Sequence, residues 1–239
     1  MSFTSKRVVA ICSIVALLIA VALAALGFLT PWTTGGVAGI DVSRHQGAID
    51  WTAVARTDVR FVYIKASEGE DHTDELFQSN WDGAARAGLK RGAYHFFTLC
   101  RPGAAQAANF LRTVPRDPNA LPPAIDLEHM GPCREGPQVE HVGAEVRSFL
   151  DLVQATTGVR PILYTTREFH DAHLAEFRGE RFWIRSLFMK PDFRRTEWVI
   201  WQHHNKARRH GVAGPVDLNT FRGDEKALDR FAAAGAPAS

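Results

Sequence analysis

Two acidic side chains, Asp126 and Glu128, lie two positions apart in a short apolar run that follows two prolines. Strand side chains alternate, so both carboxylates are expected on one face, with about 6.5 to 7 Å between their backbones. Such a buried pair is costly, because desolvation and mutual repulsion both disfavour the charged forms. Glycoside hydrolysis uses such a pair: one acid protonates the leaving oxygen, and the other stays ionised against developing positive charge. A solvated strand end is the alternative for this triplet taken alone.

Other polar residues lie at or near the carboxyl ends of apolar runs that are expected to be strands. With Glu128 these residues are Asp41, Glu68, His95, Tyr164 and Asp217. The carboxyl ends of barrel strands form the rim where barrel enzymes carry their chemistry, so we expect the acids to converge there as a catalytic or sugar-binding set. Taken singly, His95 is as well explained as a buried, satisfied histidine. Core or strand-end positions are the corresponding alternative for Tyr94, Phe96, Trp183, Trp201 and Gln202.

Hydrophobic periodicity predicts eight strands and six helices. The expected strands cover residues 37–43, 61–66, 92–97, 125–128, 161–166, 181–185, 197–202 and 216–219. The expected helices cover residues 50–57, 74–88, 103–114, 138–157, 167–176 and 224–234. A helix follows each of the first five strands, whereas proline and glycine interrupt the connections between the last three. This order predicts an α/β fold with a closed barrel.

Residues 1–34 differ in kind from the rest of the chain. Lys6 and Arg7 precede an uncharged, mostly apolar run over residues 8–30, which Pro31 ends. A bilayer span needs about 20 residues, and the basic pair predicts a cytoplasmic amino terminus. We therefore expect a cytoplasmic stub, a transmembrane helix in the cytoplasmic (inner) membrane and a linker, followed by a catalytic domain at residues 35–239 in the periplasm or outside the cell. A cleaved signal peptide, giving a secreted protein, is the alternative.

The composition is that of a globular domain, with 46% of the 239 residues hydrophobic and 23% charged. Setting aside the basic pair before the apolar run leaves 26 basic and 26 acidic residues. This balance argues against a nucleic-acid-binding protein, which needs a basic excess on one face. The basic cluster Lys206, Arg208, Arg209 and His210 is either a solvated loop or a surface that faces an anionic wall polymer.

Two cysteines lie beyond the apolar run. Cys100 follows the third expected strand, and Cys133 follows the strand that carries the paired acids. In an exported domain this pair predicts a disulfide between two loops on the same side of the fold. Metal binding is the weaker alternative, because the two cysteines do not form a C-x-x-C pair and no histidine has a ligand-like spacing.

Five ordered motifs resemble those of the glycoside hydrolase family 25 lysozymes, the Chalaropsis-type N-acetylmuramidases. They are GIDVS at residues 39–43, FVYIKASEG at 61–69, GAYHF at 92–96, IDLE at 125–128 and VDLN at 216–219. The resemblance implies an irregular TIM-like (β/α)5β3 barrel, which agrees with the strand count. It also implies hydrolysis of the β-1,4 bond between N-acetylmuramic acid and N-acetylglucosamine in peptidoglycan, with no metal or organic cofactor.

The same resemblance implies a role for each matching residue. Glu128 would be the general acid, and Asp126 would either stabilise the reaction centre or orient the substrate N-acetyl group as an internal nucleophile. Asp41 and Asp217 would be the two further acids. The expected substrate-binding residues are Tyr63, Glu68, Tyr94, His95, Phe96, Tyr164, Trp183, Trp201 and Gln202. Physically, Glu128 needs an apolar, acid-crowded setting to keep its proton, whereas Asp126 needs hydrogen-bond donors to stay charged.

The chain departs from the family pattern at two positions. Ser67 stands where the family usually has threonine, and residues 183–187 lack the aromatic residue that usually follows Trp183. The expected partners are peptidoglycan glycan strands and, through residues 8–30, the membrane, with no nucleic acid and a monomeric state. A glycan-binding anchor without catalysis and a secreted lysin that attacks a foreign wall are the alternatives.

Overall fold

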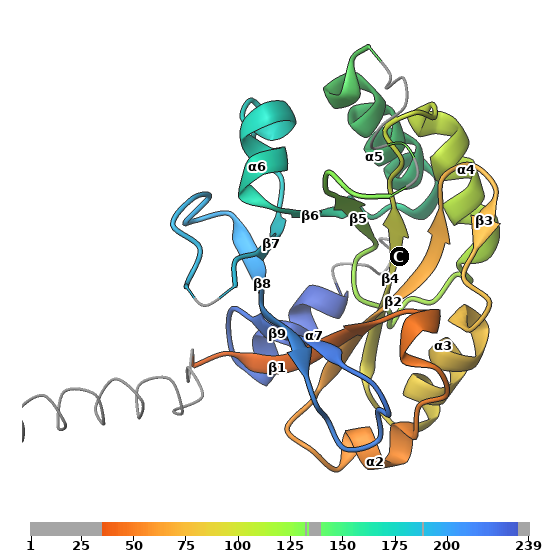
Figure 1. Cartoon of the computed structure of the whole chain (residues 1–239), viewed down its shortest axis with the longest axis vertical. Coiled ribbons are helices and arrows are strands. Elements are labelled where there is room, and N and C mark those ends of the chain that lie inside the picture. The colour runs from red at the N-terminus through yellow and green to blue at the C-terminus, as the bar shows by residue number, and fades with distance from the viewer. Residues whose placement is uncertain (1–34, 132, 134–139, 188, 234–239) are drawn as a thin grey trace, which may run out of the picture. The chain divides into compact units, whose positions relative to one another are not determined.

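The computed structural model describes residues 35–131, 133, 140–187 and 189–233, which form a β-barrel with helices around it (Figure 1). All eight expected strands are present in the barrel. They are β1 (Val37–Val42), β2 (Phe61–Glu68), β4 (Lys90–Phe96), β5 (Ala124–Leu127), β6 (Ile162–Thr165), β7 (Phe182–Arg185), β8 (Trp198–Ala207) and β9 (Val216–Phe221). A two-residue strand, β3 (His72–Thr73), adds to β2 outside the closed ring.

The barrel closes because β1 pairs with both β2 and β9. From β1 through β8 each neighbouring pair is parallel, but β9 runs antiparallel to β8 and to β1. The α/β barrel is therefore confirmed. It differs from an all-parallel TIM barrel, because a short hairpin rather than a helical crossover joins β8 to β9.

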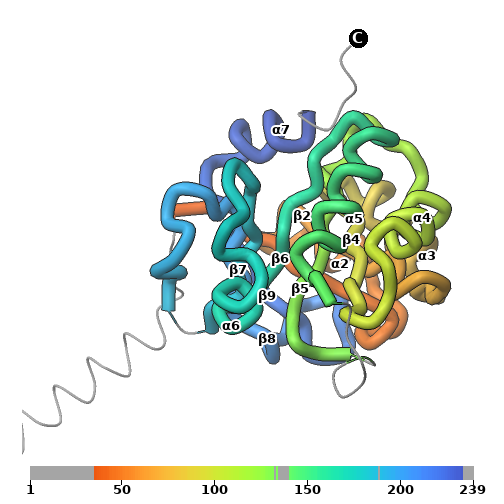
Figure 2. Tube along the Cα trace, turned by 90° about the horizontal axis from the view of Figure 1, so that it is seen from above, coloured from red at the N-terminus to blue at the C-terminus, as the bar shows by residue number. Residues whose placement is uncertain are grey.

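Helices connect the first strands and cover the outside of the barrel. They are α2 (Trp51–Ala55), α3 (Phe77–Arg86), α4 (Gly103–Thr113), α5 (Val142–Thr157) and α6 (Arg167–Phe169), with α7 (Glu225–Ala233) after the last strand. A 3-10 turn, η1 (Arg44–Gln46), follows β1, and a π-helical turn, η2 (His170–Leu174), continues α6. α4 and α5 pack side by side (Figure 2). The predicted start of α5 near residue 138 lies outside the described residues.

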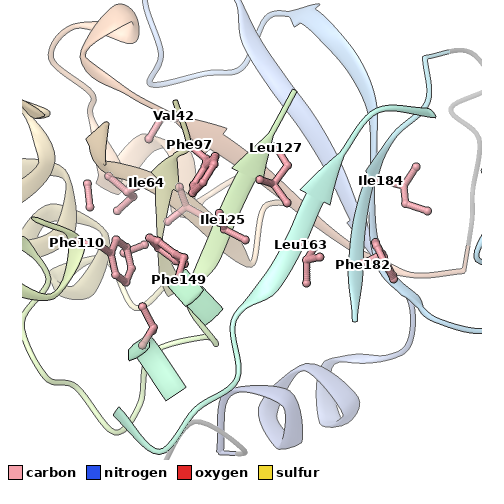
Figure 3. Close-up of a cluster of buried hydrophobic side chains, with 14 of the residues drawn as sticks. Val42, Ile64, Phe97, Phe110, Ile125, Leu127, Phe149, Leu163, Phe182 and Ile184 are labelled. Atoms are coloured by element: carbon pink, nitrogen blue, oxygen red, sulfur yellow. The ribbon is translucent and has the colours of Figure 1, made fainter. Parts of the chain in front are cut away.

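Two apolar cores hold the strands in place. One lies between the strands and the surrounding helices, where Ile125 and Leu127 of β5 gather with Phe110 of α4 and Phe149 of α5 (Figure 3). The other fills the barrel interior at the amino-terminal ends of the parallel strands. There α7 closes the barrel with Leu228, Phe231 and Ala232 against Val37, Phe61, Ala124, Ile162 and Phe221. Strand alternation explains the division, because successive side chains point into opposite cores.

The predicted transmembrane run at residues 8–30 lies outside the described residues. None of the helices within residues 35–233 that the structure describes is long and apolar enough to span a bilayer.

Candidate active site

The structure brings Asp41, Asp126, Glu128 and Asp217 to one cavity of about 240 Å³ at the carboxyl-terminal rim of the parallel strands. Asp41 lies on β1, Asp126 lies on β5, and Glu128 directly follows β5. The expectation that Asp217 lies at or near the carboxyl end of its strand was wrong, since it is the second residue of β9. Because β9 runs antiparallel to its neighbours, its amino end reaches the same rim as their carboxyl ends.

Asp41 and Asp217 share polar partners. Gln202 Nε2 donates to Asp41 Oδ2 at 3.0 Å and to Asp217 Oδ2 at 3.3 Å, and Asn219 Nδ2 donates to Asp41 Oδ2 at 2.7 Å. Burial raises the pKa of Asp41, while the hydrogen bonds from Asn219 and Gln202 oppose this rise. Burial, and then the charge of Asp41, raises the pKa of Asp217 to about 8. Asp217 therefore keeps a proton near neutral pH, and Asp41 is the better acceptor of the pair.

Asp126 lies deeper in the barrel than Glu128. It is 9% exposed, and its Oδ1 has no hydrogen-bond partner among the described residues. Burial first, and then the charge of Glu128, raises the pKa of Asp126 well above its usual range, although Lys65 opposes the shift. The donors that we expected to keep Asp126 charged are not supplied by the described part of the chain.

Glu128 lies beside an arginine. Its Oε2 is 3.6 Å from Nη1 of Arg185, and the two side chains are 12% and 29% exposed. Burial raises the pKa of the Glu128 carboxyl, and the positive charge of Arg185 opposes this rise. Burial thus favours the protonated form that a general acid requires.

Four aromatic residues form part of the cavity wall: Tyr94, Phe96, Tyr164 and Trp183. Trp183 contacts Tyr94 and Tyr164 edge to face, with ring centroids 6.3 and 4.9 Å apart. Its Nε1 donates to Asn219 Oδ1 at 2.8 Å, and Tyr164 Oη donates to Gln202 Oε1 at 3.0 Å. These contacts fix a rigid aromatic surface beside the acids, which suits the apolar face of a sugar ring.

Sequence comparisons agree with this geometry. The model of "Glycosyl hydrolases family 25" matches residues 40–212. The chain belongs to this family. It is 35% identical to YegX of Escherichia coli (strain K12) over 200 residues, covering 81% of this chain and 72% of that protein. It is 34% identical to Lysozyme M1 of Streptomyces globisporus over 215 residues, covering 83% and 72%.

Structural comparison also finds a lysozyme. The crystal structure of a bacterial lysozyme from Streptomyces coelicolor superposes with a TM-score of 0.75 and 33% identity, covering 84% of this chain and 99% of that one. This family 25 protein is therefore a glycoside hydrolase, and the predicted resemblance is confirmed.

His95 of this family 25 barrel lies away from the cavity. Its ring is fully buried between β4 and the helices, with Nδ1 2.9 Å from Ser67 Oγ and Nε2 3.2 Å from Gln106 Oε1. Burial lowers its pKa to about 3. Its neighbours Tyr94 and Phe96 point inward, so strand alternation turns His95 outward. The buried-histidine alternative describes its position.

Three other expected substrate-binding residues do not line the cavity. Tyr63 lies below it in the barrel interior, where its Oη donates to the Pro122 carbonyl at 2.9 Å. Trp201 belongs to the outer core and donates from Nε1 to the Ser186 carbonyl at 2.8 Å. Glu68 forms an ion pair with Lys65, 2.6 Å away. Tyr63 contacts Trp183 of the aromatic wall, with ring centroids 4.8 Å apart.

The sequence reasoning missed two cations beside the acids. Lys65 of β2 lines the cavity, and Arg185 ends β7 next to Glu128. A signal for Lys65 was present, because it lies two positions after the inward-facing Tyr63. The turn after β1 also contributes Ser43, His45 and Gln46 to the wall. Within the described residues, no group of three or more His, Cys, Asp or Glu side chains is arranged to hold a metal ion.

The predicted disulfide between Cys100 and Cys133 is confirmed, with the two Cα atoms 5.5 Å apart. It joins the loop after β4 to the loop after β5. Because Glu128 begins the second of these loops, the bridge restrains the chain shortly after the acid.

Proposed function

We propose that this family 25 hydrolase is a muramidase that cuts the β-1,4 bond between N-acetylmuramic acid and N-acetylglucosamine in peptidoglycan. Glu128 acts as the general acid, and Asp126 is its partner. The observation that carries the proposal is the meeting of these two acids with Asp41 and Asp217 in one aromatic-walled cavity. The similarity of this chain to Lysozyme M1 and to the Streptomyces coelicolor lysozyme supports the proposal.

The different roles of Glu128 and Asp126 follow from the different environments of their carboxyl groups. Burial favours the neutral form of Glu128, which can then give its proton to the glycosidic oxygen. Among the described residues no donor reaches the buried Oδ1 of Asp126, and an N–H group of a bound N-acetyl substituent would provide one. A hydrogen bond to the charged form lowers a carboxyl pKa, so substrate binding moves Asp126 toward the carboxylate that the reaction needs.

The proposed setting is outside the cytoplasm, with residues 8–30 as a membrane anchor. The basic pair before this run supports the orientation. The Cys100–Cys133 disulfide supports export independently, because such bonds persist in oxidising compartments. Release of the domain by signal cleavage is the alternative, and mass analysis of the mature amino terminus distinguishes the two.

The test is digestion of purified peptidoglycan by the full chain in detergent, followed by mass and reducing-end analysis of the products. Products with N-acetylmuramic acid at the reducing end are expected. Anhydro products would instead show a lytic transglycosylase. A folded protein that binds glycan without releasing products would support the non-catalytic anchor.

A further inference from the structure

Arg185 and Glu128 lie at the same level of the barrel wall. Asp126, Tyr164 and Trp183 are paired in register on β5, β6 and β7. Glu128 and Arg185 each lie two positions further along, on the same faces of their strands as Asp126 and Trp183 and one layer nearer the rim. The strand between them, β6, is followed at this level by Thr166, whose short side chain turns aside to accept a hydrogen bond from Phe169 N.

Because β6 lies between β5 and β7, a side chain on one of these two strands must be long to reach the other at this level. Neighbouring strands are about 4.8 Å apart, so β5 and β7 are separated by about twice that distance. The arginine side chain crosses this gap and brings Nη1 to 3.6 Å from Glu128 Oε2. No other ion pair or side-chain hydrogen bond of Arg185 is found within the described residues, so Glu128 is its one charged contact there.

The other groups around Glu128 do not replace this contact. Those that face it are Asp126 on β5, Asp41 on β1, Asp217 on β9, Tyr164 on β6 and Lys65 on β2. The charge of Asp41 raises the pKa of Glu128 and so disfavours its charged form, and Tyr164 is neutral. Lys65 is a cation, but its ammonium is paired with Glu68 at 2.6 Å. Among these groups, Arg185 is therefore the cation that contacts Glu128 directly.

We propose that Arg185 is a positioning residue for Glu128: its guanidinium orients the carboxyl group and sets the upper pH limit of turnover. The inference rests on the proposed role of Glu128 as general acid. As Glu128 gives its proton to the glycosidic oxygen, the bond from that oxygen to the sugar carbon breaks and its electron pair stays on the oxygen. Water later supplies a hydroxyl group to the carbon and returns a proton to the acid cluster.

Two opposite effects follow from the positive charge. Arg185 stabilises the carboxylate that Glu128 becomes, so it makes Glu128 a stronger acid and speeds proton transfer. The same attraction removes the Glu128 proton at a lower pH, so turnover stops earlier as the solution becomes alkaline. A residue that only filled space would produce neither effect.

The test compares the pH dependence of peptidoglycan turnover for the full chain and for Arg185→Met, Arg185→Lys and the control Arg230→Met. Arg230 is exposed on α7 at the closed end of the barrel, so its variant changes net charge equally without touching the acids. For Arg185→Met we expect the rate at acidic pH to fall several-fold and the alkaline limb to move up by about one pH unit. Arg185→Lys should lie between the two, and Arg230→Met should match the parent.

The outcomes separate this inference from the proposed function. An inactive parent enzyme would remove the basis for both. An active parent whose alkaline limb is unchanged in a folded Arg185→Met variant would overturn the role of Arg185 alone. A higher KM at every pH with an unmoved limb would also overturn it, because it would show that Arg185 holds an anionic group of the substrate instead. Thermal unfolding of each variant shows whether it is folded.

Discussion

Asp41 on β1 and Asp217 on β9 lie directly opposite each other in the sheet, and one side-chain amide, that of Gln202, donates to both carboxylates. The pair therefore connects β1, the first strand of the barrel, with β9, the last. The amide nitrogen of Gln202 supplies both of these hydrogen bonds, so the two carboxyl groups lie close together around one donor group. The raised pKa of Asp217 identifies it as the protonated partner.

Replacing Asp217 with Asn should flatten the loss of stability toward alkaline pH. The native pKa of Asp217 is about 8 and its ordinary value is 3.8, so the native state holds the extra proton between these limits. The stabilisation is complete below the lower limit and is lost as pH rises through the upper one. Thermal unfolding from acidic to alkaline pH should show a smaller fall for Asp217→Asn than for the parent. Parallel curves would contradict a proton retained on Asp217 in the native state.

Replacing Glu128 with Gln should lower turnover by about 100- to 10,000-fold, because general acid catalysis contributes that much. Glycan binding, measured by co-sedimentation with insoluble peptidoglycan, should remain. Glu176→Gln is the matched control, since Glu176 is exposed and does not line the cavity. Turnover that survives in Glu128→Gln would show that another group donates the proton.

Replacing His95 with Ala should destabilise the fold and leave the chemistry intact. The change removes a buried ring that is hydrogen-bonded to Ser67 and Gln106, at a cost of about 1 to 3 kcal/mol. Denaturant unfolding measures this cost, and kcat/KM per folded molecule should stay near that of the parent. A large fall in kcat/KM without loss of stability would return His95 to the substrate site.

Removing the disulfide with the double change Cys100→Ala and Cys133→Ala should lower the free energy of unfolding by about 2 to 4 kcal/mol. Chemical denaturation of the parent with and without reductant should give a similar difference. Labelling of both thiols in the untreated, non-reduced protein would show that the bridge does not form.

Much of the fold could be read from the sequence because its strands are short and buried. The alternation around Asp126 placed both acids on one face, and the proline and glycine connectors marked where the helices stop. The direction of β9 could not be read in this way, because its apolar pattern is the same for parallel and antiparallel pairing. Only the pairing with β1 and β8 shows that the amino end of β9 reaches the rim.

The directions of two expected site side chains depend on strand alternation. A polar or aromatic residue near a strand end is a candidate for the site, but alternation turns His95 and Trp201 into the outer core. Arg185 was missed because its relation to Glu128 depends on β6 lying between them with a short residue at that level. Such a relation belongs to the register of three strands rather than to any local motif.

The two ends of the barrel differ in use. The chain enters β1 at Val37, at the end that α7 closes with Leu228 and Phe231, and the acids open at the other end. A solid support or a fused domain joined ahead of Gly35 is therefore attached at the end of the barrel that α7 closes. Beads that carry the protein in this orientation would leave the cavity with the four acids open to insoluble wall fragments. The hairpin between β8 and β9 accepts a hydrogen bond from Gln46 at the cavity wall. Coupling through this hairpin would turn the cavity toward the bead.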